Sequence, residues 1–89
     1  MVYRLSRRAR ADIKEIARYT DLTFGQAQTD QYLDGLYYSF DLLTDNPEMG
    51  REWSAGRRRY VYRKHIVYYR ITDSGILITQ IRHSAMRQP

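Results

Sequence analysis

The chain has 89 residues, of which 43% are hydrophobic and 28% charged, and its formal net charge is +5; this balance is typical of one globular domain with a single core. The absence of cysteine excludes disulfides, cysteine nucleophiles and cysteine-based zinc sites. The longest apolar run, residues 66–69, is too short to span a membrane, and no segment resembles a signal peptide, so we expect residues 1–89 to form one cytoplasmic domain.

The chain begins with the pattern of a short strand and a helix. Residues 2–6 alternate in polarity, as a strand does. Ser6 is a suitable N-cap, because its hydroxyl can accept a hydrogen bond from a free N–H of the following turn. From residue 7 to about residue 23, apolar side chains recur at three- and four-residue spacing, which predicts a helix with one buried face. Gly25 ends this helix.

A second helix is predicted over residues 26–44, closed by Pro47 and Gly50. Its apolar residues gather on about a third of its circumference. A row of aspartates lies on a different sector, and such a row is usually a solvated helix face, so no metal site is expected. The row consists of Asp30, Asp34, Asp41 and Asp45.

The second half of the chain changes to an alternating pattern. We expect a loop over residues 47–57, then strands over residues 57–63, 65–72 and 76–82, with a hairpin turn at residues 73–75. The predicted order is therefore β-α-α-β-β-β. It describes an α+β domain in which a helical hairpin packs on one face of a small, largely antiparallel sheet.

Basic residues are concentrated in this second half. Residues 1–50 contain six Lys or Arg against eight Asp or Glu, residues 51–89 contain nine against two, and thirteen of the fifteen basic residues are Arg. Because guanidinium groups pair well with carboxylates and phosphates, an acidic partner is indicated, either nucleic acid or an acidic protein segment. The alternative is that the positive charge serves only the solubility of a small basic protein. The interleaved tyrosines, Tyr68 above all, are expected to pack in the core under the helices. Stacking on nucleic acid bases is the alternative.

Few residues offer catalytic chemistry. The chain has two histidines and no glycine-rich phosphate loop, and no cofactor is expected. One acid–base set is conceivable for metal-free RNA cleavage, which needs a base, a cation and an acid around the reacting phosphate. Its members would be Glu52, Arg58 and His83. The alternative is that His83 only ends the last strand and forms hydrogen bonds to the sheet.

Several segments, in order, resemble ParE-type toxins of the ParE/RelE superfamily. The resemblance runs from Val2 to Met86, and the fold that it implies agrees with the predicted β-α-α-β-β-β order. The matching segments are LSRRARADI at residues 5–13 with Ile16 and Tyr19, NPEMGR at 46–51, GRRRY at 56–60, HIVYYRI at 65–71 and ILITQIRH at 76–83.

The resemblance implies the toxin of a bacterial type II toxin–antitoxin pair. ParE-type members act on DNA gyrase by protein contact and stall it with broken DNA, so the chain is expected to be an inhibitor and not an enzyme. The implied partner is a ParD-like antitoxin, whose C-terminal segment folds onto the toxin and recovers its ordering entropy through burial and charge pairing. Direct binding to nucleic acid is not expected except through the antitoxin complex.

Charge and expected exposure indicate which residues meet these partners. For the target we expect a surface of basic residues and the tail: Arg57, Arg58, Arg59, Arg82, His83, Met86 and Arg87. For the antitoxin we expect basic residues and an apolar edge: Tyr37, Tyr38, Arg58, Arg63 and Arg70.

RelE- and YoeB-like members of the superfamily instead cut mRNA on the ribosome, and this is the alternative function. The chain departs from the pattern of Arg, Lys and a C-terminal Tyr, because its last tyrosine is Tyr69, its only lysines are Lys14 and Lys64, and Gln80 stands where many relatives carry Arg. The second pattern, of Glu, Arg and His, would use Glu52, Arg58 and His83. A third possibility is a basic module that binds bare DNA with a steep salt dependence.

Overall fold

The computed structural model describes residues 2–86 and contains two helices and five strands in that range. The first three elements are β1 (Val2–Leu5), α1 (Arg7–Phe24) and α2 (Gln26–Asp45). They are followed by β2 (Arg51–Ser54), β3 (Arg57–Tyr62), β4 (His65–Thr72), β5 (Gly75–His83) and a 3-10 turn, η1 (Ser84–Met86).

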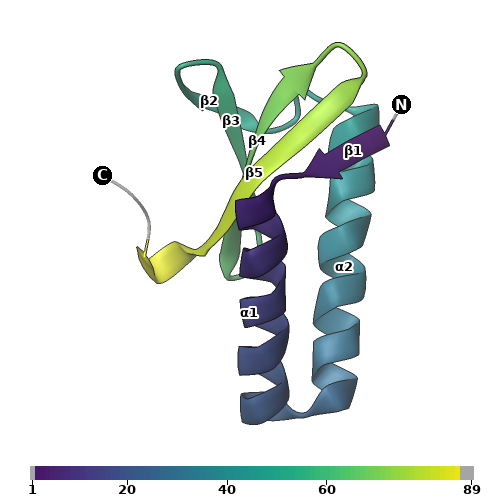
Figure 1. The fold of residues 1–89 in the computed structure, drawn as a ribbon, viewed down its shortest axis with the longest axis vertical. Coiled ribbons are helices and arrows are strands. Elements are labelled where there is room, and N and C mark those ends of the chain that lie inside the picture. The colour runs from purple at the N-terminus through teal and green to yellow at the C-terminus, as the bar shows by residue number, and fades with distance from the viewer. Residues whose placement is uncertain (1, 87–89) are drawn as a thin grey trace.

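All five strands form one sheet in the order β1-β5-β4-β3-β2. β1 runs parallel to β5, and the remaining neighbours are antiparallel. The two helices lie side by side as a hairpin, and the end where they join projects away from the sheet (Figure 1). The predicted α+β fold is therefore confirmed.

The helix boundaries follow from local chemistry. Ser6 caps α1 as expected, because its Oγ accepts from the Ala9 N–H at 3.0 Å. Gly25 separates the helices with a φ of +94°, a conformation that glycine adopts without a steric penalty. Both helices begin where the sequence predicted and end one residue later than expected.

The hydrophobic core lies between the helices and one face of the sheet. Ala9, Ile13 and Ile16 face the sheet from α1, and Leu36, Phe40 and Leu43 do so from α2. The sheet contributes Val67 and Tyr69 from β4 and Ile76, Ile78 and Ile81 from β5. Fully burying an Ile, Leu, Val or Phe side chain stabilises the fold by about 1.5–3 kcal/mol.

Two polar side chains attach the start of α1 to β5. The Ser6 hydroxyl donates to the Thr79 carbonyl at 2.7 Å, and Asp12 Oδ2 accepts from the Ile81 N–H at 2.9 Å. These contacts lie beside the irregularity where the β4–β5 register shifts between Tyr68 and Tyr69. They fix the hairpin over one face of the sheet and leave the opposite face without a helix.

Residues 51–54 form a strand, β2, where the sequence analysis expected a loop. The expectation was wrong because β2 is a four-residue edge strand whose pairing with β3 is interrupted between Glu52 and Ser54. So short and bulged a strand shows no alternation that sequence analysis can detect.

Tyr68 is fully buried, as predicted, but not under the helices. It is absent from the core between helices and sheet, which contains its neighbour Tyr69, and successive strand residues point to opposite faces. Tyr68 therefore lies on the face of the sheet away from the helices, where it packs against Trp53. The expectation that Tyr68 packs beneath the hairpin was wrong, because residues 66–69 are apolar on both faces.

Candidate functional site: the open face of the sheet

The face of the sheet away from the helices is strongly basic. Residues paired across neighbouring strands share a face, so the core residues Tyr60, Val67 and Ile81 define the helix side. The positions between them define the open side. We call the arginines of the open side the open basic face: Arg4, Arg51, Arg57, Arg59, Arg70 and Arg82.

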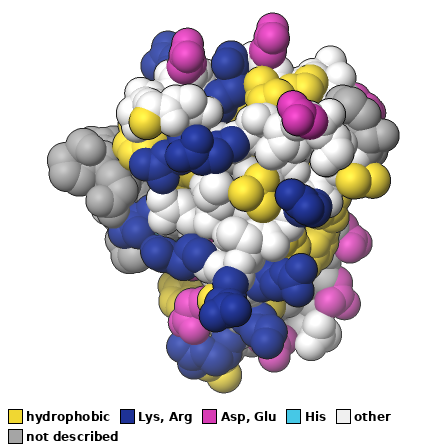
Figure 2. Space-filling model, turned by 45° about the horizontal axis from the view of Figure 1, so that its top comes forward, with side chains coloured by type: hydrophobic (Ala, Val, Ile, Leu, Met, Phe, Trp, Pro, Cys, Tyr) yellow, Lys and Arg dark blue, Asp and Glu magenta, His cyan; other side chains and the backbone are white. Residues whose placement is uncertain are grey.

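Within residues 2–86, no Asp or Glu lies on the open side of a strand. Figure 2 shows how Lys and Arg gather across one face of the molecule, with most Asp and Glu toward its outline. Like charges held this close repel each other, and a partner of opposite charge relieves that repulsion. The open basic face therefore has the electrostatics of a surface for an acidic partner.

Trp53 packs onto this face from the edge strand β2 and was not among the predicted site residues. Its ring centre is 5.0 Å from that of Tyr68 and 5.0 Å from Cζ of Arg57. Because the interruption of β2 falls at Trp53, the side chain reaches across β3 to β4. The sequence signal was the chain's single tryptophan just before a turn, where Ala55 and Gly56 both have positive φ.

A hollow of about 680 Å³ adjoins the open basic face near β2 and β3. Arg51 and Arg59 contribute charge to its wall, whereas Met49, Val61 and Ile66 contribute apolar surface. Met49 and Val61 are also well exposed. The hollow therefore suits a segment that combines acidic and apolar side chains.

Arg58 differs from its two neighbours because it lies on the helix side of β3. Its Nε donates to the Gly50 carbonyl at 3.0 Å, and its Nη2 donates to the Glu48 carbonyl at 3.3 Å. The Tyr69 hydroxyl supports the same segment by donating to the Pro47 carbonyl at 2.6 Å and accepting from the Gly50 N–H at 2.9 Å. Burial raises the pKa of Tyr69, so this hydroxyl stays protonated.

The structure does not bring the three residues of the conceivable acid–base set together. Glu52 and Arg58 occupy paired positions on β2 and β3. On β4, however, Arg58 pairs with Tyr69 while His83 of β5 pairs with His65. These two β4 positions are four residues apart, about 13 Å along the strand, and the Arg58 guanidinium is directed to Gly50 and Glu48.

His83 ends β5 and contacts its partner on β4. Its Nδ1 accepts from the Ala85 N–H at 3.1 Å, and its ring centre is 5.2 Å from that of His65. His65 in turn pairs its Nδ1 with the Tyr32 hydroxyl at 2.6 Å. Burial, with a smaller contribution from the neighbouring His83, lowers the pKa of His65 from about 6.5 to about 4.

This low pKa predicts a stability that depends on pH. Between pH 6.5 and pH 4 the unfolded chain binds a proton at His65 that the folded chain does not bind. The free energy of unfolding is therefore expected to fall as the pH drops through this window, by at most about 1.4 kcal/mol per pH unit for one proton. Urea unfolding of the native protein and of His65→Gln from pH 7.5 to 4.5 checks this. His83→Gln removes only the smaller cause of the shift and is expected to keep most of the pH dependence. If the free energy of unfolding fell equally with pH in the native protein and in His65→Gln, His65 would bind its proton at the same pH in the folded and the unfolded chain. The prediction would then be wrong.

The residues expected to contact an antitoxin lie on different sides of the molecule. Tyr37 and Tyr38 are exposed on α2, and Arg63 is exposed in the turn between β3 and β4. Arg70 lies on the open basic face, where its Nη1 donates to the Ala55 carbonyl at 3.4 Å. A single partner touching all four would have to wrap around the sheet.

Of the expected tail residues, Met86 belongs to η1, and Arg87 lies outside the described residues.

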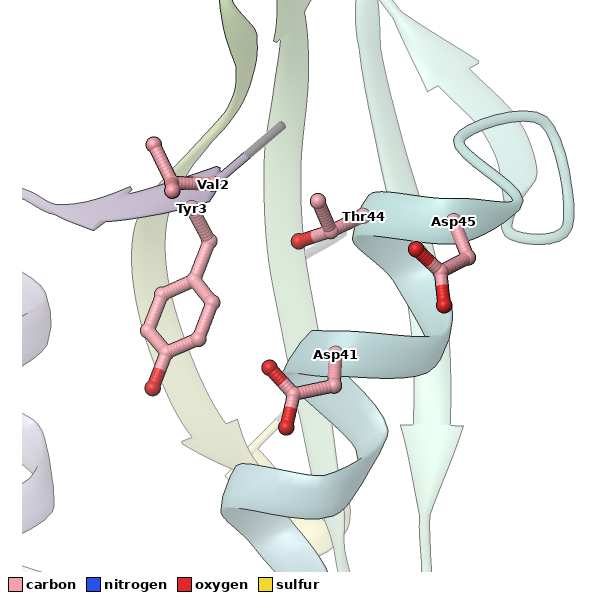
Figure 3. A pocket seen from close by; sticks show the side chains of 5 residues that line it. All are labelled: Val2, Tyr3, Asp41, Thr44 and Asp45. Carbon is pink, nitrogen blue, oxygen red and sulfur yellow. The ribbon is translucent and has the colours of Figure 1, made fainter.

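A second hollow, of about 380 Å³, lies between β1 and α2 and is drawn in Figure 3. Asp41 and Asp45 border it from α2, with Tyr3 on the opposite side. Burial, and secondarily the charge of Asp41, raises the pKa of Tyr3. Residues 2–86 contain no group of three His, Asp or Glu side chains placed to hold a metal ion.

The same fold occurs in chains of solved toxin–antitoxin systems. The fold matches a chain of the chromosomal ParDE toxin–antitoxin system from P. aeruginosa with a TM-score of 0.81 and 19% identity, over 93% of this chain and 95% of that chain. It also matches a chain of the RelBE2 toxin–antitoxin complex from Mycobacterium tuberculosis, with a TM-score of 0.64 and 19% identity, over 92% and 95% of the two chains.

The sequence identifies the family within this class. Residues 3–88 match the model of the ParE toxin of the type II toxin–antitoxin system parDE. The chain is 35% identical over 87 residues to Toxin ParE1 of Caulobacter vibrioides, covering 94% of this chain and 90% of that relative. The chain therefore belongs to the ParE family of type II toxin–antitoxin toxins. No described helix combines the length and hydropathy needed to cross a membrane.

Proposed function

We propose that the protein inhibits DNA gyrase by direct protein contact and that a ParD-like antitoxin neutralises it. The observation that carries this proposal is the open basic face, with its six arginines on the uncovered side of the sheet. Such a face favours association with an acidic protein surface. Membership of the ParE family and the fold match to a ParDE system support the choice of target and partner.

The proposal makes the protein a binding inhibitor and not an enzyme. The separation of His83 from Glu52 and Arg58 supports this assignment, since acid–base catalysis needs groups within hydrogen-bond reach of one substrate. Action on gyrase would place the protein in the cytoplasm.

The target contacts are proposed at the expected basic residues and tail: Arg57, Arg58, Arg59, Arg82, His83, Met86 and Arg87. The antitoxin contacts are proposed at Tyr37, Tyr38, Arg58, Arg63 and Arg70. In both sets Arg58 acts indirectly, by holding the Glu48 and Gly50 carbonyls in place.

Gyrase supercoiling of relaxed plasmid tests the proposal. The purified, refolded protein is expected to block supercoiling and to leave linear DNA when the complexes are denatured, because a stalled enzyme retains cleaved strands. Ribosome-bound mRNA is expected to stay intact in a parallel reaction.

Two results would contradict this function. Folded protein that leaves supercoiling unchanged would remove gyrase as the target. Cleavage of ribosome-bound mRNA that Glu52→Gln or His83→Gln abolishes would instead establish the endoribonuclease activity, since removal of an essential acid or base costs about 10²-fold or more.

A further inference from the structure

Two buried polar atoms on the open side of the sheet have no hydrogen-bond partner among the described residues: Arg57 Nε and Tyr68 Oη. Tyr68 is 0% exposed, so bulk water does not reach its hydroxyl in this arrangement. Leaving a buried donor unpaired is costly, and most buried donors in folded proteins are paired. Both atoms belong to side chains packed on Trp53.

These three residues form what we call the Trp53 cluster: Trp53, Arg57 and Tyr68. Arg57 and Tyr68 are diagonal neighbours on β3 and β4, since Tyr68 pairs with Arg59 two residues along β3. Trp53 belongs to a short, bulged edge strand, and few contacts restrain such a strand. The cluster can therefore rearrange when a partner supplies acceptors from the open side.

The missing group has a definite chemistry. A guanidinium N–H and a phenolic O–H both need an oxygen acceptor, and an anionic acceptor suits a face of six arginines. The Trp53 ring already contacts Tyr68 and Arg57, so it offers a poor platform for stacking a nucleic acid base. The adjoining hollow, with Met49, Val61 and Ile66 in its wall, adds room for apolar side chains.

We propose that the Trp53 cluster binds an acidic, extended segment of the antitoxin, whose carboxylates accept from Arg57 Nε and Tyr68 Oη while its apolar side chains enter the adjoining hollow. This inference rests on the antitoxin partner of the proposed function. It adds a binding site for that antitoxin segment, which includes Trp53 and Tyr68. Because Arg57 and Arg59 are also proposed target contacts, the segment neutralises the toxin by covering the residues that hold the target.

The single tryptophan of the chain makes this site directly observable. A 12-residue peptide of three Glu-Glu-Leu-Ala repeats serves as the probe and is titrated into the purified protein at low salt. We expect saturable binding with a change in Trp53 fluorescence, and weaker binding as salt screens the charges. The same peptide with Gln in place of Glu is expected to bind at least tenfold more weakly.

Tyr68→Phe separates binding from folding. It removes only the hydroxyl that has no partner in the free protein, so the melting temperature is expected to stay unchanged or to rise. Its affinity for the acidic peptide is expected to fall about tenfold, the effect of losing one hydrogen bond to a charged group. Tyr19→Phe, which removes an exposed hydroxyl on α1, is the matched control.

Arg57→Gln is expected to weaken peptide binding at least tenfold, whereas Arg10→Gln, with the same charge change on exposed α1, changes it less than twofold. Unchanged affinity in Tyr68→Phe would overturn the proposal. Tighter binding of a single-stranded dT12 oligonucleotide than of the peptide would overturn it in favour of nucleic acid. If the protein inhibits gyrase but does not bind the peptide, this inference is wrong and the proposed function stands. If it binds the peptide but does not inhibit gyrase, the inference stands and gyrase is not the target.

Discussion

Arg58→Ala is expected to lower the free energy of unfolding by about 2–3 kcal/mol, because it leaves two carbonyl groups without a charged donor. The Nε and Nη2 groups of Arg58 hold the Gly50 and Glu48 carbonyls. The contact with the Gly50 carbonyl is part-buried, and Gly50 is closely packed, since a side chain there would collide with the Tyr69 hydroxyl and the Arg59 carbonyl. Urea unfolding monitored by circular dichroism measures the loss.

Arg59→Ala is the matched control, one residue further along β3. Its side chain lies on the open side and forms no hydrogen bond or ion pair within residues 2–86. It is therefore expected to change the free energy of unfolding by less than about 1 kcal/mol. If Arg58→Ala kept the stability of the native protein but lost 100-fold or more in toxicity, Arg58 would act directly on the target or on a substrate.

The elements of the fold were predictable because their patterns are local. The helix caps, the helical spacing of the apolar residues and the turn before Gly75 lie within a few residues of each other in sequence. β2 escaped prediction for the opposite reason. Its existence depends on pairing with β3, and its four residues, with a bulge at Trp53, carry no periodic signal of their own.

The open basic face was predictable in part. Alternation along residues 57–63 separates Arg57 and Arg59 from Tyr60, and the structure confirms that separation. The sequence could not predict whether Tyr68 faces the helices or the open side, because residues 66–69 are all apolar and show no alternation. The contact of Trp53 with Tyr68 depends on β2, so missing that strand also meant missing the cluster.

The distance between His83 and the pair of Glu52 and Arg58 also lay beyond the sequence. Strand alternation indicates a face but not the position along the sheet. In the structure β4 lies between β3 and β5, and the pairing places Arg58 beside Tyr69 and His83 beside His65. The strand register therefore separates His83 from Glu52 and Arg58, although strand alternation alone would have allowed them to lie close together.

The double variant Arg57→Glu/Arg59→Glu is expected to weaken gyrase inhibition at least 100-fold. Two positive charges at the centre of the open basic face become negative, and like charges placed across an interface cost several kcal/mol. Arg57 also loses its contact with Trp53, which contributes about 0.5–2 kcal/mol to stability. The variant is therefore expected to melt at a somewhat lower temperature but to remain folded at 25 °C, where supercoiling is measured.

The control must carry the same change in net charge on a different face. Arg7→Glu/Arg10→Glu does so on α1, where both side chains are exposed and neither forms a hydrogen bond or ion pair among residues 2–86. It is expected to leave inhibition within about threefold of the native protein, since rim and remote charges act mainly through the association rate. Equal losses in the two double variants would mean that inhibition depends on net charge and not on the open basic face. A loss confined to Arg57→Glu/Arg59→Glu places the target contact on the side of the sheet that the helices leave uncovered.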